Sequence, residues 1–337
     1  MNETKVVLSG MRSTGKIHLG NYFGALKNWV ELQDRYQCLY MVADWHALTS
    51  DYADPSQISA NGIDMAADWL SAGLDPEKSV IFIQSLVPEH AELHLLLSMI
   101  TPLGWLERVP TYKEQIQQIE NKDLSTYGFL GYPVLQTVDI AIYRAHFVPV
   151  GEDQASHLEI SREIVRRFNS YYGGIFPEPQ ALFTPTPKVP GIDGRKMSKS
   201  YGNAINLSDP PEVIREKCRQ MFTDPQRLTR KDPGRPEVCN LYEFHKLMSP
   251  ADVQERVARQ CRAAEIGCVD DKKLLAEIMI EYLEPMRKRR AELDRDTVYD
   301  ILVEGSKKAR ERAGETMELV RGAIGLDYRK VLEKVAG

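Results

Sequence analysis

A chain of 337 residues, 43% of them apolar, is long enough for two globular domains and a large core. Its formal net charge of −5 gives no overall basic excess, so any contact with nucleic acid must come from local patches. The sequence shows no secretory leader, no apolar run near the length of a membrane span and an odd number of cysteines, five, which together predict a cytoplasmic protein without a disulfide framework.

The first half of the chain alternates short β-rich runs with helical patterns. We expect buried strands at 6–8, with a break at Ser9-Gly10, and at 38–42, 79–83 and 147–150. We expect helices at 58–70, 132–143 and 157–168, with Pro133 in a first helical turn. This alternation predicts a parallel sheet with right-handed crossovers, in which ligands bind beyond the carboxyl ends of the strands.

The chain divides into two predicted domains. Segment 89–119 is mostly helical and does not fit a simple crossover, so we expect a helical insertion at about 85–130. A Pro- and Gly-rich stretch at 173–194 ends the β-rich half, and charge-dense helices follow at 211–221, 241–247, 251–264, 271–294 and 296–319. The predicted fold class is α/β, with a Rossmann-like sheet in residues 1–208 and an all-helical bundle in residues 209–337, whose last helix is a candidate to pack back on the sheet domain.

Two stretches carry phosphate-binding chemistry. Residues 5–24, KVVLSGMRSTGKIHLGNYFG, read as strand, small-residue loop and helix N-terminus, which is the usual layout of an anion site, although neither standard nucleotide fingerprint is present. Alone, this stretch is equally an ordinary first βα turn. Residues 194–200, GRKMSKS, place two lysines and two serines in a Gly-flanked loop, and lysines in a mobile loop can reach phosphate oxygens. A solvated basic linker is the alternative for this motif alone, and the anion-type loop upstream argues against it.

HLGN at 18–21 and KMSKS at 196–200 resemble the two signatures of the class I aminoacyl-tRNA synthetases, and GMRSTGKIHLGNYFGALKNWV, ADWHALTSDY and VPVGEDQASHLEISREIVRRFN resemble the bacterial tryptophanyl branch of that class. The resemblance covers essentially the whole chain. It implies an enzyme that activates L-tryptophan with ATP, releases pyrophosphate and transfers tryptophan to the 3′ end of its tRNA, with Mg²⁺ accompanying ATP. It also implies a homodimer with its contact around residues 90–130.

The resemblance assigns most phosphate contacts to the two signatures. The catalytic candidates that it implies are His18, Asn21, Lys196, Ser198 and Lys199. The ATP site that it implies adds Arg12, Ser13 and Thr14 at the triphosphate, Gly20 beside the adenosine, Gly151, Glu152 and Asp153 at the ribose, Val189 near the adenine, and Met197 and Ser200 in the second signature.

The amino-acid pocket can also be argued from the chemistry of indole, which offers one N–H donor on a large apolar body. Asp139, in the apolar context VDIAIY, matches the family carboxylate that accepts the indole N–H hydrogen bond. The alternative is that Asp139 is an ordinary aspartate on a helix surface. A buried carboxylate left without its partner costs about 1–3 kcal/mol, which would help to reject phenylalanine. The other pocket residues that the resemblance implies are Tyr132 and Gln154 at the α-amino group, and His46, Gln136, Leu8, Val148 and Val150. His46 alone could also be a structural histidine.

The sequence departs from the family pattern at several positions. Ser13 stands where a proline is common, which would loosen the first loop. Gln115 stands where some relatives carry a lysine near the phosphates, which leaves Lys113 or Arg12 as the compensating cation. Cys239, Cys261, Cys268 and Asp271 lie where some tryptophanyl enzymes hold a 4Fe–4S cluster on four cysteines. Because such clusters normally need four thiolates, we expect a remnant without a cluster rather than a three-Cys-plus-Asp site.

Local basic runs occur at 227–231, 286–290 and 307–312. Each run alone is explained by a solvated helix face, whereas the three together are candidates for contacts with tRNA phosphates. Two rival interpretations remain. A tyrosyl enzyme shares both signatures and the YPxLQxxD-type helix at 132–139. A non-catalytic, RNA-binding paralogue would be expected to lose the phosphate-contact residues, which are all present here.

Overall fold

The structure, a computed structural model, describes residues 5–109, 112, 124–151, 155–183 and 189–328. Its centre is a five-stranded parallel sheet with the strand order β3-β2-β1-β4-β5. The strands are β1 (Val6–Arg12), β2 (Gln37–Ala43), β3 (Ser79–Ile83), β4 (Phe147–Val150) and β5 (Gln180–Phe183). The predicted α/β class with a parallel sheet is therefore confirmed.

Two details of the sheet differ from the sequence prediction. β1 does not break at Ser9-Gly10 but continues to Arg12, because it stays paired with β2 along its whole length. Glycine is needed at position 10, where a Cβ would lie 2.7 Å from the Met41 carbonyl oxygen of β2. The apolar run ends earlier than the strand because only Val6–Leu8 are buried. β5 was not predicted, because its short apolar run, 181–183, lies inside the Pro- and Gly-rich stretch 173–194 that we interpreted as the end of the β-rich half.

The helices around the sheet follow the predicted alternation. They are α1 (Leu19–Asn21), a π-helical turn η1 (Tyr22–Leu26), α2 (Lys27–Leu32), α3 (Asp44–Asp51), α4 (Ile58–Ala72), the 3₁₀ turn η2 (Gln84–Leu86), α5 (Glu89–Ser98), α6 (Leu103–Leu106), α8 (Tyr127–Leu130), α9 (Tyr132–Ile142) and α10 (Ala155–Tyr172). The predicted helices at 58–70, 132–143 and 157–168 correspond to α4, α9 and α10. Within the predicted insertion, α5, α6 and α8 are helical, while 110–111 and 113–123 lie outside the described residues.

Alternate strand residues point to two different cores, as the period of a strand requires. Val7, Tyr40 and Ile81 face the layer that contains Trp29 and Trp69. Leu8, Met41 and Phe82 face the opposite layer, which α9, α10 and the last helix help to cover. Tyr40 stacks on Trp29 with ring centroids 4.8 Å apart, and its hydroxyl donates to the Trp29 carbonyl oxygen at 2.8 Å. Both faces of the sheet are therefore covered.

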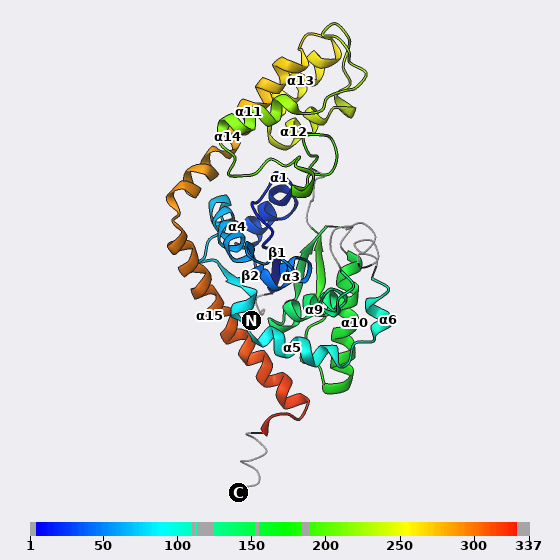
Figure 1. The fold of residues 1–337 in the computed structure, drawn as a ribbon, viewed down its shortest axis with the longest axis vertical. Helices are drawn as coiled ribbons and strands as arrows, with labels where there is room; N and C mark the ends of the chain where they lie inside the picture. Colours follow the sequence, from blue (N-terminus) through cyan, green and yellow to red (C-terminus); the bar gives the residue numbers. More distant parts are fainter. Residues whose placement is uncertain (1–4, 110–111, 113–123, 152–154, 184–188, 329–337) are drawn as a thin grey trace.

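The second half of the chain is helical, as predicted. Its helices are α11 (Pro211–Gln220), α12 (Asn240–Met248), α13 (Ala251–Arg262), α14 (Cys268–Glu292) and α15 (Arg295–Ala323), with 3₁₀ turns η4 (Lys199–Tyr201) and η5 (Pro236–Val238). Figure 1 shows α11, α12 and α13 at one end of an elongated molecule, while α14 and α15 run back along the sheet. The division at residues 208 and 209 stays a prediction. Among the described residues, no helix has the length and apolar character needed to span a membrane.

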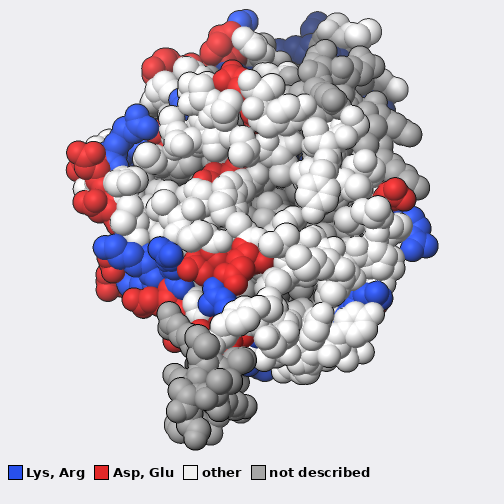
Figure 2. Space-filling model, turned by 60° about the horizontal axis from the view of Figure 1, so that its bottom comes forward, with Lys and Arg blue, Asp and Glu red and all other residues white. Residues whose placement is uncertain are grey.

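The last helix, α15, is bound to the sheet and to α5. A Cβ on Gly305 would lie 1.9 Å from the carbonyl oxygen of Ile81 on β3, so the helix backbone touches the strand directly. At the lower end of Figure 1, Arg310 and Arg321 pair with Glu89 and Glu92 of α5, with Nε–Oε1 distances of 3.0 and 2.7 Å. Figure 2 brings this end forward: charges of both signs are interspersed on one side, and a large part of the face carries none.

Candidate active site

A cavity of about 330 Å³ opens at the carboxyl ends of β1 and β4. The strand order reverses between these two strands, and ligands of open α/β sheets bind at such a switch point. Helices α3 and α9 close the cavity from the side. The predicted pocket residues that line it are Leu8, His46, Tyr132, Gln136, Asp139, Val148 and Val150. Gln154 lies outside the described residues, as do Glu152 and Asp153, while Gly151 is at the rim.

Asp139 is buried at the floor of this cavity with 3% of its surface exposed, so the alternative of a helix-surface aspartate is wrong. His46 Nε2 lies 2.6 Å from its Oδ2, and Gln84 Nε2 donates to its Oδ1 at 2.7 Å. A carboxylate has about four lone-pair directions, so these two contacts leave it able to accept a further N–H from a ligand. The ring of His46 meets Tyr132 edge-on, with centroids 4.8 Å apart.

Sequence reasoning missed Gln84 and His90, which are both fully buried next to Asp139. Neither residue lines the cavity. Gln84 directly follows the apolar run of β3, and a polar amide at the carboxyl end of a buried parallel strand was the signal that could have found it. His90 carried no such signal, because its place beside Asp139 depends on how α5 folds back.

The first signature is organised by a capping box at the start of α1. The Asn21 backbone N–H donates to His18 Nδ1 at 3.2 Å, and the His18 backbone N–H donates to Asn21 Oδ1 at 3.3 Å. Because Nδ1 accepts, the neutral His18 ring carries its proton on Nε2. Burial lowers the pKa of His18 to about 4, and the positive charge of Lys199 adds to this effect. His18 therefore offers one neutral N–H donor at physiological pH.

Gly20 serves the geometry of His18. A Cβ at position 20 would lie 2.9 Å from two atoms of the His18 ring and 3.6 Å from Cβ of Met197. The glycine therefore admits both the capping histidine and the second signature. We predicted that Gly20 would leave room for adenosine, and that role stays a prediction.

The segment that follows the second signature is joined to the chain around the first signature by backbone hydrogen bonds. The Leu19 N–H donates to the Ile205 carbonyl at 2.8 Å, and the Leu207 N–H donates to the Ile17 carbonyl at 2.9 Å. These bonds hold Lys196–Ser200 beside the first loop, with Met197 buried against it. Lys199 Nζ lies 3.6 Å from the position of a Cβ on Gly15. The structure thus brings the two signatures together.

Lys199 is an exposed residue overall, and the end of its side chain lies against Gly15 of the first loop. Partial loss of hydration there lowers the pKa of Lys199 to about 8, and the charge of Asp68 opposes the shift. The Lys196 side chain is exposed at the surface, and nothing is described of the Ser200 side chain. Asn203, which sequence reasoning missed, braces the loop: its Oδ1 accepts the Ser198 N–H at 2.9 Å, and its Nδ2 donates to the Lys196 carbonyl at 3.2 Å.

The remaining predicted ATP residues lie near the signatures. The Arg12 guanidinium binds Ser50 Oγ and lies 4.0 Å from Asp51, while the Thr14 N–H donates to the Arg12 carbonyl at 2.8 Å. Ser13 is buried, and its hydroxyl has no hydrogen-bond partner among the described residues. Val189 is buried, and its carbonyl accepts the Met197 N–H at 3.3 Å. Gln115 and Lys113 lie outside the described residues.

The cysteine site does not fit an iron–sulfur cluster. The guanidinium of Arg227 lies between two of the thiols, with Nη1 at 3.6 Å from Cys261 Sγ and 3.9 Å from Cys268 Sγ. Asp271 is engaged by His245, whose Nε2 is 3.1 Å from Oδ1. Cys239 adds a third thiol, and four thiolates are the normal requirement. Over the described ranges, no group of three or more His, Cys, Asp or Glu is placed to hold a metal ion.

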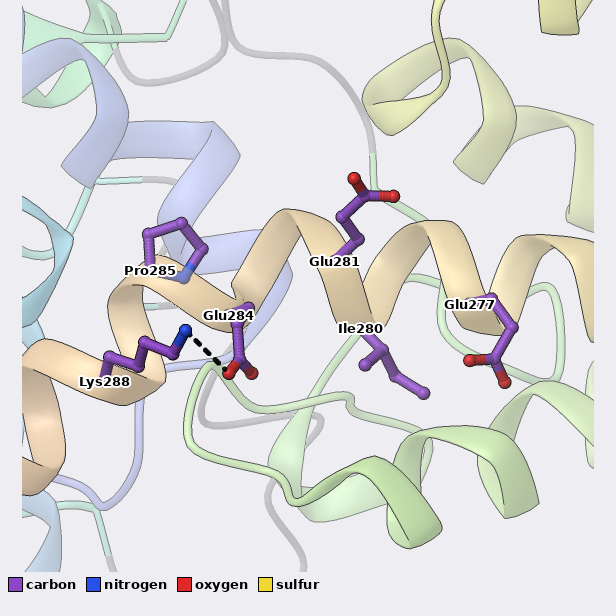
Figure 3. Close-up of a pocket in the computed structure, with 6 residues that line it drawn as sticks. All are labelled: Glu277, Ile280, Glu281, Glu284, Pro285 and Lys288. Atoms are coloured by element: carbon purple, nitrogen blue, oxygen red, sulfur yellow. Dashed lines mark ion pairs between the residues drawn. The ribbon is translucent and has the colours of Figure 1, made fainter.

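A separate hollow of about 490 Å³ lies along α14 and is shown in Figure 3. All six residues that line it belong to this one helix: Glu277, Ile280, Glu281, Glu284, Pro285 and Lys288. Lys288 Nζ is paired with Glu284 at 3.5 Å. This hollow lies on the face of a single helix and contains no residue from either signature. Its carboxylates would repel phosphate, so it is not a candidate for the ATP site.

This chain resembles a family model, related sequences and a solved structure that are all of tRNA synthetases. The model of the family "tRNA synthetases class I (W and Y)" matches residues 1–284. A tryptophan–tRNA ligase of Thermotoga maritima is 52% identical, covering 96% of this chain and 99% of the relative, and one of Aquifex aeolicus is 45% identical, covering 95% and 99%. The crystal structure of tryptophanyl-tRNA synthetase from Campylobacter jejuni complexed with ADP and tryptophan has a TM-score of 0.87 and 35% identity, covering 95% of this chain and 100% of that chain.

Proposed function

The chain belongs to the class I tRNA synthetases of the W and Y group, and from this premise we propose that it activates L-tryptophan with ATP and joins it to its tRNA. It is an ATP-dependent aminoacyl-tRNA ligase. The observation that carries the assignment is the apolar cavity with Asp139 at its floor, beside the joined signatures. Asp139 alone would accept a phenol O–H as well as an indole N–H, so the choice of tryptophan over tyrosine rests on the relatives.

The first step forms the adenylate. One carboxylate oxygen of tryptophan attacks the α-phosphorus of ATP, a new P–O bond forms, and the bond between that phosphorus and the α–β bridging oxygen breaks, so that pyrophosphate leaves. No protein nucleophile is needed, and the protein contributes position and charge. We assign phosphate contacts to His18 Nε2–H, Asn21, Lys196, Ser198 and Lys199. Arg12, Ser13 and Thr14 would lie along the triphosphate.

The second step moves the acyl group. A ribose hydroxyl at the 3′ end of the tRNA attacks the carbonyl carbon of the adenylate, the ester bond forms, and AMP leaves with the electrons of the broken C–O bond. The hydroxyl proton leaves with the phosphate oxygens or solvent. Basic runs at 227–231, 286–290 and 307–312 are proposed to contact tRNA phosphates. We place this reaction in the cytoplasm.

Mg²⁺ is proposed to arrive with ATP. In the described part of the chain, no carboxylate cluster could hold it by itself, so phosphate oxygens and water would supply most of its ligands. The ion would neutralise charge on the leaving pyrophosphate. Lys199 and Lys196 would share that task, since an ammonium acts on phosphate as a compact point charge.

The test is amino-acid-dependent exchange of pyrophosphate into ATP, followed by charging of tRNA. We expect exchange with tryptophan and no exchange with tyrosine or without amino acid. Exchange with tyrosine but not tryptophan would overturn the assignment in favour of a tyrosyl enzyme. Exchange without charging of any tRNA would support the paralogue that binds RNA without aminoacylating it.

A further inference from the structure

Two buried residues that do not line the cavity lie beside Asp139, and one of them, Gln84, bonds its carboxylate. Gln84 begins the turn after β3, and His90 lies in the first turns of α5. Gln84 Nε2 donates to Asp139 Oδ1 at 2.7 Å, while His90 Nε2 stands 3.9 Å from the same oxygen. Both side chains are completely buried. Their place on the protein side of the carboxylate suggests a role in orienting it.

Gln84 connects the elements that surround Asp139. Its Oε1 accepts the backbone N–H of His46 at 3.4 Å, which ties it to the start of α3. Its backbone carbonyl lies 3.3 Å from His90 Nδ1. A carbonyl oxygen can only accept, so Nδ1 of His90 carries the proton. One glutamine therefore bonds with α3, α5 and α9 at the same time.

His90 offers no donor to Asp139 in its neutral form. Burial lowers the pKa of His90, and with the proton on Nδ1 its Nε2 presents a lone pair toward the carboxylate. Nε2 has no hydrogen-bond partner among the described residues. Two facing acceptors repel, so Asp139 gains nothing by turning toward His90, and its strong contacts are those with Gln84 and His46.

The strand end that carries Gln84 is itself fixed by α15. The backbone N–H of Ile83 donates to Ser306 Oγ at 3.1 Å, and Gly305 lies directly against Ile81. The residue before Gln84 therefore cannot shift without breaking a contact with the last helix. Gln84 therefore extends from a strand end whose position is fixed when it bonds Asp139.

We propose that Gln84 is a positioning residue for amino-acid recognition: it fixes the Asp139 carboxylate so that a free lone pair meets the indole N–H, and His90 fixes Gln84 in turn. This inference rests on the proposed function, because it takes tryptophan as the occupant of the cavity. Its consequence is specificity for the N–H group. A buried acceptor whose orientation is fixed discriminates strongly against a ligand that lacks the donor.

The decisive variant is Gln84→Met, which keeps the length of the side chain and removes its amide. Pyrophosphate exchange is measured with tryptophan and with β-(3-benzothienyl)alanine, in which sulfur replaces the indole N–H. We expect the KM for tryptophan to rise about tenfold, the KM for ATP to change less than about twofold, and the preference for tryptophan over the sulfur analogue to fall about tenfold. A general loss of structure would affect both amino acids and ATP alike.

The matched control is Thr137→Val. Thr137 lies on the same helix as Asp139, is completely buried and bonds Ser161 Oγ at 3.1 Å and the Pro133 carbonyl at 2.8 Å, away from the carboxylate. We expect this variant to keep the wild-type preference for tryptophan. The inference is overturned if Gln84→Met keeps the preference, or if Thr137→Val loses it to the same extent.

A second pair of variants tests the role of His90 if Gln84→Met does not fold, as judged by circular dichroism and thermal melting. His90→Asn retains a donor in the place of Nδ1 and should retain the preference, whereas His90→Leu should lower it. Equal preferences in these two variants would overturn the inference. If the wild-type protein itself shows no tryptophan-dependent exchange, the proposed function fails, which is a different result from either of these.

Discussion

At the scale of single residues, the environment of Lys199 adapts an ordinary lysine to phosphate. The ammonium end lies over Gly15 in the first loop, where partial dehydration lowers its pKa to about 8. Lys199 is therefore mostly charged at pH 7 and loses its charge as the pH rises through 8. His18 is neutral over the same range, because its pKa is about 4. Only one of these two residues should affect the pH profile near neutrality.

We predict that kcat/KM for ATP in pyrophosphate exchange falls as the pH rises through about 8, because this parameter reports the ionisation of the free enzyme. Lys199→Arg should remove the fall, since a guanidinium stays charged. Lys199→Ala should lower adenylate formation by a factor of about 10²–10³, with a much smaller change in tryptophan affinity.

The measurement is a set of pH profiles between about pH 7 and pH 9.5 for the wild type and both variants, together with tryptophan binding by fluorescence. If kcat/KM for ATP in the wild type stays constant across this pH interval, Lys199 does not cause the predicted fall. Equal losses of adenylate formation and tryptophan affinity in Lys199→Ala would argue against a role in the transition state.

At the scale of elements, the contact between α15 and β3 has a simple steric basis. Gly305 brings the helix backbone against the Ile81 carbonyl, so no other residue fits there without movement. The sequence did not reveal this contact, because a glycine within a charge-dense helix looks like an unfavourable helix residue and nothing more. In the structure, glycine at this position lets α15 pack directly against β3, even though glycine has a low helix propensity.

We predict that Gly305→Ala lowers the free energy of unfolding by about 1–3 kcal/mol, because the new Cβ would lie 1.9 Å from the Ile81 oxygen and must push the helix from the sheet. Gly314→Ala is the control on the same helix: among the described residues, no atom beyond its own stretch of helix lies within 4 Å of the new Cβ, and the change should stabilise by about 0.4–1 kcal/mol. Urea unfolding monitored by circular dichroism measures both. Equal effects of the two changes would show that α15 does not depend on this contact.

At the scale of the whole molecule, several apolar side chains between residues 95 and 127 face solvent. Leu95 of α5, Met99 directly after that helix, Leu103 of α6 and Tyr127 of α8 are each more than half exposed. They belong to the segment around residues 90–130 that we expect to form the contact of a homodimer. Figure 2 shows that much of the face at the α5 end carries no charge, which suits an apolar interface.

We predict a dimer in solution, which sedimentation at micromolar concentration would show as about twice the chain mass of 38.3 kDa. Leu103→Glu should convert it to a monomer with unchanged helix content, since a buried charge in an interface is costly while the side chain is exposed in the single chain. Leu228→Glu, at an 85% exposed leucine in the helical half, is the control and should stay dimeric. A wild-type monomer, or a dimeric Leu103→Glu variant, would contradict the predicted interface.

The sequence alone determined the parts of this protein that are encoded locally. Continuous apolar runs marked β2, β3 and β4, and period and composition marked the charge-dense helices. Short motifs marked the two signatures and Asp139, because their chemistry depends on residue types at fixed spacing.

The tertiary structure decided what depends on residues far apart in the chain. It added β5, whose short apolar run lies within a Pro- and Gly-rich stretch, and it placed Gln84 and His90 behind Asp139. It brought the two signatures together, with hydrogen bonds that link Ile17 and Leu19 to the segment that follows the second one. An apolar run or a helix period is a property of residues that are neighbours in the sequence. These contacts form only because the packed sheet and helices bring residues that are distant in the sequence within hydrogen-bonding distance.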